Sequence, residues 1–532
     1  MDWAATLTVT LIAGFLRFWK LGQPHAFSFD ETYYAKDAWS LLHHGYVQGY
    51  VDKADDHILA GDTTGQWTGD PSMIVHPEAG KWLIALGERA FGMDPFGWRV
   101  SAAVVGTLMV LVMIRFARRL TGSALLGLVA GILLAFDGLQ LVLSRLALLD
   151  IFVAFWLLLG VHLLVVDRDQ ARSRLARLAP AGVSSGWGPV RGLLVRPWLL
   201  LSGVAWGLAL ATKWTPVYAL AAFGLLAWAW MAGARRAAGV DRPVLRSLVV
   251  DAPVMAVTLL AAALATYVLT WTGWLMNADV YEEHLASTQY RTFDGWDGTC
   301  DGKKMEDVKS TPGRTWPTAK EPDASGVGEV VQSLRSLWYY HQDVYTFHTH
   351  FLNCAEHTYA SKPSGWLLLN RPVGVDAQLD IQPGQQGCEA AAGSDCLRQV
   401  LLLGNPVLWW GSVLALVASV WFWALGRDWR FGIAVVGVAA TWLPWLLYDD
   451  RPIFSFYAIV CLPFLVLAST LVIGKLLGAS REPSARRTVG VIVAGSFVVL
   501  TVMAFAWFWP IWTDQLITHG EWIDRMWFTR WR

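Results

Sequence analysis

The 532-residue chain carries little charge. Only 16% of its residues are charged, whereas ordinary soluble domains contain about 25%. Lys and Arg number 42, as do Asp and Glu, which gives a formal net charge of +0. A protein that binds nucleic acid through bulk positive charge is therefore excluded. A disordered chain is excluded as well, because disorder requires low hydrophobicity and high net charge.

Motifs for soluble nucleotides and metals are also lacking. The sequence contains no Walker loop and no GxGxxG followed by a ribose-binding acid, so a soluble nucleotide is not expected as a direct donor. It contains no HExxH or CxxC pattern that would close a metal site. We therefore predict a protein that needs neither a metal ion nor another cofactor.

Long apolar runs are abundant instead. Hydrophobic residues make up 55% of the chain, and 32 residues are Trp, which gathers at membrane interfaces. Because about 20 apolar residues cross a bilayer, the sequence predicts an all-α polytopic membrane protein with about 11 transmembrane helices. The predicted spans are 3–20, 98–117, 122–143, 147–166, 197–213, 215–232, 248–272, 406–425, 431–448, 453–474 and 488–511.

Basic residues give the orientation. Arg and Lys concentrate in one alternate set of connections, including 115–119, 168–196 and 235–246. Cytoplasmic loops carry this excess, which predicts a cytoplasmic N-terminus and two long external loops. The expected modules are 1–274 with seven spans and a catalytic external loop at 21–97, an external loop at 275–404, and 405–532 with four spans and an external tail.

An acidic pair, Asp30 and Glu31, follows the first span. Adjacent carboxylates at a membrane surface cost free energy unless they are solvated, paired or used. Ser28 and Glu31 also fit an S-x-x-E capping box, so one interpretation is a capped helix lying in the membrane interface. That interpretation explains Glu31 better than Asp30, and a catalytic role remains the alternative. Arg99, just inside the second span, needs an anionic partner that this pair can supply.

Three cations interrupt the charge rule. Arg145, Lys213 and Arg451 lie in short turns on the predicted outer face, where few are expected. Together they indicate a bound anion, and a lipid phosphate lies at this depth. The alternative is generic headgroup binding or local ion pairing, such as Arg145 with Asp150.

Aromatic and His residues cluster in the second long loop. The segment 337–350 mixes Trp and Tyr with His, a composition that suits carbohydrate through ring stacking and hydrogen bonds to hydroxyls. A metal site is the weaker alternative, because no carboxylate–His pattern accompanies it. The candidate acceptor or sugar-binding residues are His76, Lys81, Trp338, His341, His348 and His350.

Four of the five cysteines lie in the same loop. External thiols tend to pair in an oxidising compartment. Cys388–Cys396 would close a short loop and is the preferred pair, which leaves Cys300–Cys354; free thiols are the alternative. Cys461 lies within a predicted span and is expected to be a small core residue.

These motifs resemble a known family in order along nearly the whole chain. The sequence is similar to bacterial, actinobacterial-type protein O-mannosyltransferases, which have the C-type (GT-C) membrane glycosyltransferase fold. One departure is Glu78, where the family commonly has a second proline after the His. Another is the second loop, which is too short for the β-trefoil-type domain of eukaryotic members. The matching pieces are Asp30-Glu31, His76-Pro77, Gly80-Lys81, Trp98-Arg99, Ala135 to Asp150, Gly207 to Trp214, Leu337 to His350, Tyr359 to Pro363, Arg371-Pro372, Arg451 to Tyr457 and Phe508 to Trp527.

The resemblance implies an activity at the outer face of the bacterial cell membrane. Mannose would pass from polyprenyl-phosphate mannose to Ser or Thr hydroxyls of secreted or membrane proteins, with inversion. Asp30 would be the general base, Glu31 would pair with Arg99 or bind substrate, and Arg145, Lys213 and Arg451 would hold the donor phosphate. Membrane lipids and the protein-export translocon are the other expected partners. The alternatives are transfer of a lipid-linked sugar to a lipid or polysaccharide, or transport of a lipid or solute.

Overall fold

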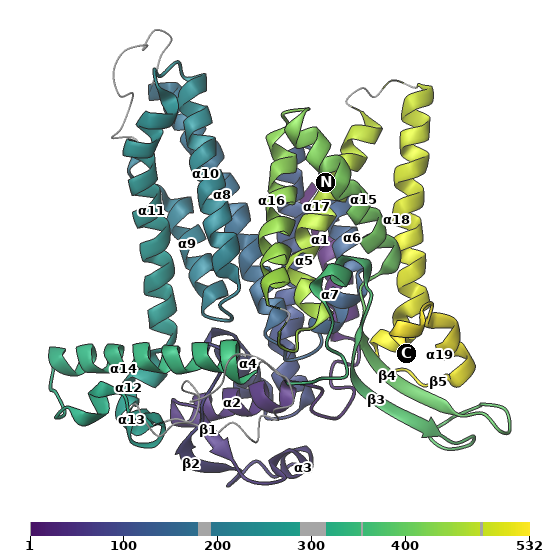
Figure 1. The fold of residues 1–532 in the computed structure, drawn as a ribbon. Helices are drawn as coiled ribbons and strands as arrows, with labels where there is room; N and C mark the ends of the chain where they lie inside the picture. Colours follow the sequence, from purple (N-terminus) through teal and green to yellow (C-terminus); the bar gives the residue numbers. More distant parts are fainter. Residues whose placement is uncertain are drawn as a thin grey trace.

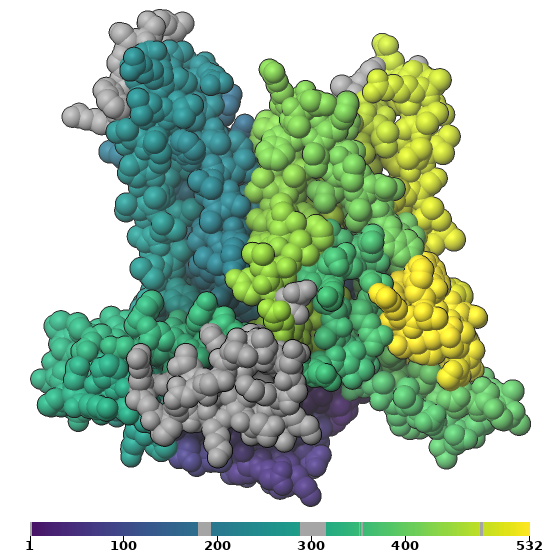
Figure 2. All heavy atoms as spheres, viewed as in Figure 1, coloured from purple at the N-terminus to yellow at the C-terminus, as the bar shows by residue number. Residues whose placement is uncertain are grey.

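The computed structural model describes residues 2–178, 193–287, 315–352, 355–448, 450–478, 482 and 484–532. Long helices stand side by side in one layer, and short helices with two small sheets cover one end of it (Figure 1). The C-terminus lies in the covering layer, whereas the N-terminus lies within the helical layer (Figure 1). In the space-filling view, the long helices of residues 150–270 (blue to teal) meet those of residues 406–512 (green to yellow) above the covering layer (Figure 2).

The helical layer confirms a multi-span membrane protein. In the part of the chain that the structure describes, seven helices are long and apolar enough to cross a membrane. Four shorter apolar helices fill the other predicted spans, so the count of eleven stays a prediction. The seven are α5 (Pro95–Thr121), α8 (Asp150–Leu178), α10 (Pro216–Ala237), α11 (Pro243–Thr270), α15 (Pro406–Ala424), α16 (Trp429–Trp442, continued by η6, Leu443–Leu447) and α18 (Ala485–Trp512); the four are α1 (Asp2–Phe18), α6 (Ala124–Ala135), α9 (Pro197–Leu210) and α17 (Leu462–Leu477).

Proline sets many of the helix starts. Five apolar helices (α5, α9, α10, α11 and α15) begin with Pro, whose fixed φ suits the first helical position and whose missing N–H is not needed there. Helix α8 is the most enclosed, since 72% of its most apolar stretch is buried, against 28% for α11, α15 and α18. The layer therefore has α8 inside and the other three at its periphery.

The first external segment forms part of the covering layer. It contains α2 (Glu31–His44), β1 (Gln48–Tyr50), α3 (Ala54–Leu59), β2 (Trp67–Pro71) and α4 (Ala79–Phe91), with β1 and β2 antiparallel. Tyr34, Ala38 and Leu41 of α2 are buried in the protein core. These side chains pack on neighbouring elements, so this face of α2 does not rest in the membrane interface, which was one of the two interpretations of the acidic pair.

The predicted capping box at the start of α2 is only half present. Asp30, not Ser28, is the N-cap residue, and its side chain makes no capping bond. The backbone N–H of Ser28 does donate to Glu31 Oε2 at 2.9 Å. Glu31 thus satisfies the turn before the helix, and the Asp30 carboxylate remains available.

The second external segment lies across the ends of the long helices. Helix α14 runs perpendicular to them in Figure 1. One face of α14, which carries Tyr340, packs on an aromatic cluster that includes Trp271, Trp274 and Trp316. The opposite face exposes Val327, Val330, Val331, Leu334 and Trp338. The segment contains α12 (Thr272–Met276), α13 (Ala278–Leu285), η3 (Pro317–Lys320), α14 (Val327–Thr346), η4 (Phe347–Phe351) and η5 (Pro363–Leu368).

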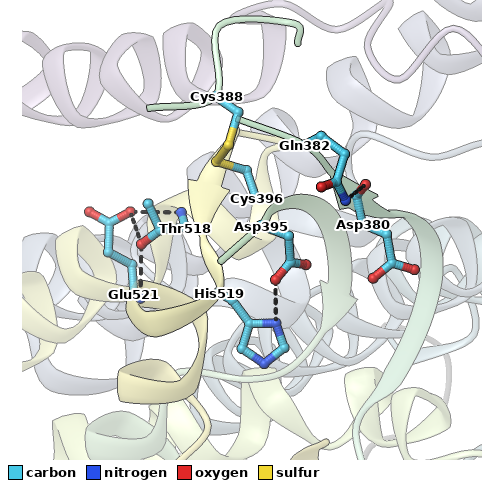
Figure 3. The surroundings of a disulfide bond; sticks show 8 residues. All are labelled: Asp380, Gln382, Cys388, Asp395, Cys396, Thr518, His519 and Glu521. Atoms are coloured by element: carbon cyan, nitrogen blue, oxygen red, sulfur yellow. Dashed lines mark hydrogen bonds and ion pairs between the residues drawn. A yellow bond between two sulfur atoms is a disulfide. The ribbon is translucent and has the colours of Figure 1, made fainter. Parts of the chain in front are cut away.

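A hairpin of β3 (Val373–Ile381) and β4 (Cys396–Leu402) joins this layer, and β5 (Ile517–Thr518) extends it in the order β3–β4–β5. The structure contains the preferred Cys388–Cys396 disulfide, with a Cα–Cα distance of 5.8 Å (Figure 3). Cys300 and Cys354 lie outside the described residues. Short elements α7 (Gly138–Leu143), η7 (Ser455–Val460), α19 (His519–Arg525) and η8 (Thr529–Trp531) complete the chain.

Candidate active site

Asp30 lies half-buried where the chain turns into α2. The preceding residue, Phe29, has a φ of 53°, which is uncommon for a bulky side chain. Its ring packs edge-on against Phe454 and Phe456, with centroids 5.6 and 5.9 Å away. Contacts with a distant part of the chain therefore hold the turn that presents Asp30.

The Asp30 carboxyl is poised to exchange a proton. Burial raises its pKa to about 6; Lys213 opposes this shift, while Asp150 adds to it. The Tyr34 hydroxyl donates to Asp30 Oδ2 at 3.3 Å. A carboxyl with a pKa near 6 is ionised at neutral pH and is a stronger base than an exposed aspartate.

Glu31 and Arg99 form a fully buried, bidentate ion pair. Arg99 Nε and Nη2 donate to the two Glu31 oxygens at 2.8 and 2.6 Å. The backbone N–H of Ala147 also donates to Glu31 Oε1 at 2.8 Å. Arg99 donates further to two backbone carbonyls of the 21–28 loop, at 2.8 and 2.9 Å. The pair therefore ties the start of α2 to α5 and to the residues before α8.

A cavity of about 300 Å³ lies among α8, α10, α16 and the covering layer. Asp30 is not one of its lining residues, but Lys213 and Asp150 of the lining act electrostatically on Asp30. The cavity has polar and apolar parts. The polar lining comes from His76, Asp150, Lys213, His348, Arg451 and Tyr457, and the apolar lining includes Val153, Leu157, Pro216, Ala440, Pro444 and Val460. Such a site matches a ligand with a charged head and a hydrocarbon chain.

Two cations line the polar part. Lys213 Nζ lies 2.7 Å from Asp150 Oδ2, which leaves two of its three N–H groups for another acceptor. Asp150 thus pairs with Lys213 rather than with Arg145. Arg451 Nη1 donates to His348 Nδ1 at 2.8 Å, whereas the buried Arg451 Nε has no partner among the described residues.

The neighbouring imidazoles are neutral. Because a guanidinium can only donate, His348 Nδ1 accepts from Arg451, and its Nε2–H donates to the carbonyl of Val75 at 2.8 Å. Burial and the Arg451 charge lower the pKa of His348 to about 4. His76 stacks on His348 with centroids 5.5 Å apart, and burial holds its pKa well below the ordinary value. The cavity wall thus contains uncharged imidazoles, and both ring nitrogens of His348 bind groups of the protein itself.

Three predicted site residues lie elsewhere. Arg145 donates to four backbone carbonyls at the end of α1, at 2.5 to 3.4 Å, and so caps that helix. Lys81 Nζ pairs with Asp37 Oδ2 at 2.8 Å. Trp338 is 64% exposed. The structure therefore does not bring these three side chains to the cavity.

His341 and His350 belong to the second external segment, in α14 and η4 respectively. His341 Nε2 lies 2.6 Å from the Tyr267 hydroxyl, and its ring stacks on Trp214, which lines the cavity. His341 thus supports the wall from behind. The backbone of His350 belongs to η4, but its side chain lies outside the described parts.

The sequence interpretation missed two tyrosines. Tyr34 lies four residues after Asp30, a spacing that places both on one helical face, so it was detectable. Tyr457 lies under Lys213, with Nζ 5.0 Å from the ring centroid, and no local pattern marks it. Within the described ranges, no group of three or more His, Cys, Asp or Glu converges as a metal site.

The fold defines the class of protein. The structure resembles that of the S. cerevisiae protein O-mannosyltransferase Pmt1–Pmt2 complex bound to the sugar donor, with a TM-score of 0.67 and 14% identity. The match covers 100% of this chain and 92% of that chain. It confirms the predicted C-type membrane glycosyltransferase fold.

Sequence comparison then gives the family. Residues 7–190 match the model of dolichyl-phosphate-mannose-protein mannosyltransferase, and 333–531 match that of the C-terminal four-helix membrane region of protein O-mannosyltransferase. A polyprenol-phosphate-mannose–protein mannosyltransferase of Mycobacterium tuberculosis is 35% identical over 100% of this chain and 92% of its own length. One from Corynebacterium glutamicum is 30% identical over 95% and 88%. The chain belongs to the protein O-mannosyltransferase family and is a glycosyltransferase, as predicted.

Proposed function

We propose that this protein transfers mannose from polyprenyl-phosphate mannose to Ser or Thr hydroxyls of proteins, with Asp30 as the general base. The observation that carries this proposal is the mainly apolar cavity with a charged polar part, whose cation Lys213 acts electrostatically on Asp30. Full-length relatives named for this donor and for protein acceptors support it.

The donor fits the two parts of the cavity. Its prenyl chain would lie along the apolar lining, and its phosphate would accept hydrogen bonds from Lys213 and Arg451, whose remaining N–H groups have no other described acceptor. Fixed cations stabilise the charge that develops on a leaving phosphate. A phosphate leaves as an anion, so no general acid is required.

The acceptor hydroxyl needs a base. As its oxygen bonds to mannose C1, its proton passes to Asp30, the C1–O bond to phosphate breaks, and the electron pair of that bond stays on the phosphate. A single displacement of this kind inverts the anomeric configuration. Positioned bases typically contribute about 10²–10⁴-fold. Neutral His76 would bind a sugar hydroxyl without repelling an oxocarbenium-like transition state, whereas His348, whose two ring nitrogens bind Arg451 and Val75, would position Arg451.

Glu31 and Arg99 are positioning residues in this scheme. Their charges neutralise each other, and the described hydrogen bonds of the pair go to the protein itself. They fix the backbone from which Asp30 projects, and they need not contact substrate.

Mannosyl transfer can be tested with purified protein, labelled polyprenyl-phosphate mannose and a Thr peptide. We expect labelled peptide from the wild type, and a loss of at least about 10²-fold for Asp30→Asn. Asp52→Asn, an exposed aspartate of the same segment, is the matched control and should retain activity. Near-normal transfer by Asp30→Asn would remove it from the mechanism, and labelled glycolipid in place of peptide would refute the acceptor.

The donor site has its own test. Lys213→Met and Arg451→Met should each raise the KM for the donor, because each deletes a phosphate donor group. Lys20→Met, a cation of the same external layer outside this cavity, should leave the donor KM unchanged. Unaltered donor KM values in the first two variants would exclude them from the phosphate site.

The site is proposed to face the outside of the cell membrane, where exported proteins, including those leaving the translocon, present extended hydroxyls. The asymmetry of Arg and Lys between the loops supports a cytoplasmic N-terminus. An Asp52→Cys variant should react with a membrane-impermeant maleimide in intact cells. Labelling only after permeabilisation would reverse the orientation.

A further inference from the structure

A second and larger cavity lies beside the stretch of chain that precedes the Asp30 turn. It measures about 1100 Å³ and shares no lining residue with the cavity that contains Lys213. Its floor is one face of the β3–β4 hairpin, where Gln378 and Arg398 are cross-strand partners. Its walls are the 19–26 stretch after α1 and the 513–516 stretch after α18. We refer to it as the hairpin groove.

The hairpin groove connects directly to the catalytic turn. The Ser28 hydroxyl donates a hydrogen bond to Oδ2 of Asp376, a residue of the groove floor, at 3.5 Å. Ser28 lies two residues before Asp30, and its hydroxyl also accepts from Arg99 at 3.4 Å. A molecule held in the groove therefore lies near the segment that presents the base.

Four of the residues that line the hairpin groove carry carboxamides. A glutamine amide both donates and accepts, so it matches the N–H and C=O groups of an extended peptide whatever its sequence. These amides have no side-chain partner among the described residues. They belong to Gln23, Gln378, Gln386 and Gln515.

The charges of the groove disfavour other occupants. Burial, together with repulsion from Asp376, raises the pKa of Asp514 to about 6. Two carboxyls oppose an anionic ligand, while Lys20 and Arg398 oppose a cationic one. A hydrocarbon chain finds few partners there. An uncharged, hydrogen-bonding polymer fits best.

We propose that the hairpin groove binds the acceptor polypeptide as an extended chain, several residues away from the hydroxyl that is mannosylated. This inference rests on the proposed function. The groove then recognises backbone rather than side chains, so acceptors are selected for being unfolded and uncharged over this stretch.

The test compares two acceptor peptides with the full-length protein. One has about four residues and the other about 12, because an extended residue spans ~3.3 Å and only the longer one reaches along the groove. We expect Gln378→Ala/Gln515→Ala to lower kcat/KM for the long peptide relative to the short one by about tenfold, through KM, since each lost hydrogen bond contributes a factor of a few.

Gln382→Ala is the matched control. Gln382 is exposed on the same hairpin, near the disulfide and outside the groove (Figure 3), and its replacement should leave the ratio unchanged. A photoreactive residue placed about eight positions from the acceptor Thr should crosslink to 376–398 or 513–516. An unchanged ratio in the double variant, or crosslinks only elsewhere, would overturn the groove assignment. Failure of the wild type to mannosylate either peptide would instead overturn the proposed function.

Discussion

The pKa of Asp30 makes the pH profile of transfer a direct test of the site. Burial raises this pKa from 3.8 to about 6, and only the ionised carboxylate can accept a proton. The rate should therefore be maximal above pH 7 and fall about tenfold for each pH unit below 6. At pH 5 only about one tenth of the enzyme would carry an ionised Asp30, whereas an ordinary aspartate would still be almost fully ionised.

The assay is kcat/KM for a Thr peptide between pH 4.5 and 8.5 with purified protein. In Lys213→Met, the midpoint should move to higher pH, because Lys213 lowers the pKa of Asp30. His348 cannot produce this limb, since its pKa is lowered to about 4. Asp514, with a pKa of about 6, is the competing group, so Asp514→Asn must retain the limb. A flat profile down to pH 5, or loss of the limb in Asp514→Asn, would refute the assignment.

Further predictions concern stability. Arg99→Met should lower the free energy of unfolding by about 3–5 kcal/mol, because Glu31 is left buried without its partner. The double variant Arg99→Met/Glu31→Gln should recover part of the lost stability in thermal unfolding. A loss below about 1 kcal/mol in Arg99→Met would contradict the prediction. Burial raises the pKa of Glu78 from 4.5 to about 8. Between these two pH values the unfolded chain loses the Glu78 proton while the folded protein keeps it, so the free energy of unfolding falls as the pH rises from 4.5 to about 8. Glu78→Gln should therefore reduce the fall in Tm between pH 5 and 9, and an unchanged fall would exclude Glu78 as its source. Cys388→Ser/Cys396→Ser opens a loop with a sequence separation of 8, and loss of a disulfide of this size lowers stability by about 2–3 kcal/mol. We expect faster proteolysis between the two positions. Equal rates of proteolysis would show that the crosslink is dispensable.

Local and periodic features of the sequence predicted much of the fold. The apolar runs coincide with the long and short apolar helices of the structure, because each crossing needs only its own residues to be apolar. The acidic pair after the first span, Arg99 as its partner and the short cysteine loop were equally visible, since each rests on residue type and spacing. Lys213 and Arg451 were singled out because cations on that face violate a simple charge rule.

The roles of side chains that contact residues far away in the sequence could not be predicted. Arg145 resembled Lys213 in sequence, yet it binds carbonyls at the end of α1, more than 120 residues away. Lys81 is neutralised by Asp37, and nothing in the spacing of those two residues marks the contact. Trp338 shares a helix with His341 but lies on its exposed side. Whether such a side chain reaches the cavity depends on how the helix is rotated about its axis relative to its neighbours. Sequence motifs do not give that rotation.

The exposed side of α14 has a consequence for how this enzyme responds to its surroundings. Helix α14 lies level with the ends of the long helices (Figure 1), and its exposed face carries Val, Leu and Trp side chains, as do amphipathic helices that rest in the headgroup layer. The same rod continues into η4 and carries His348 to the cavity. Any displacement of α14 relative to the long helices would therefore move the imidazole of His348 and the hydrogen bond that this ring accepts from Arg451. The position of this external helix is thereby coupled to the geometry of the proposed donor-phosphate site.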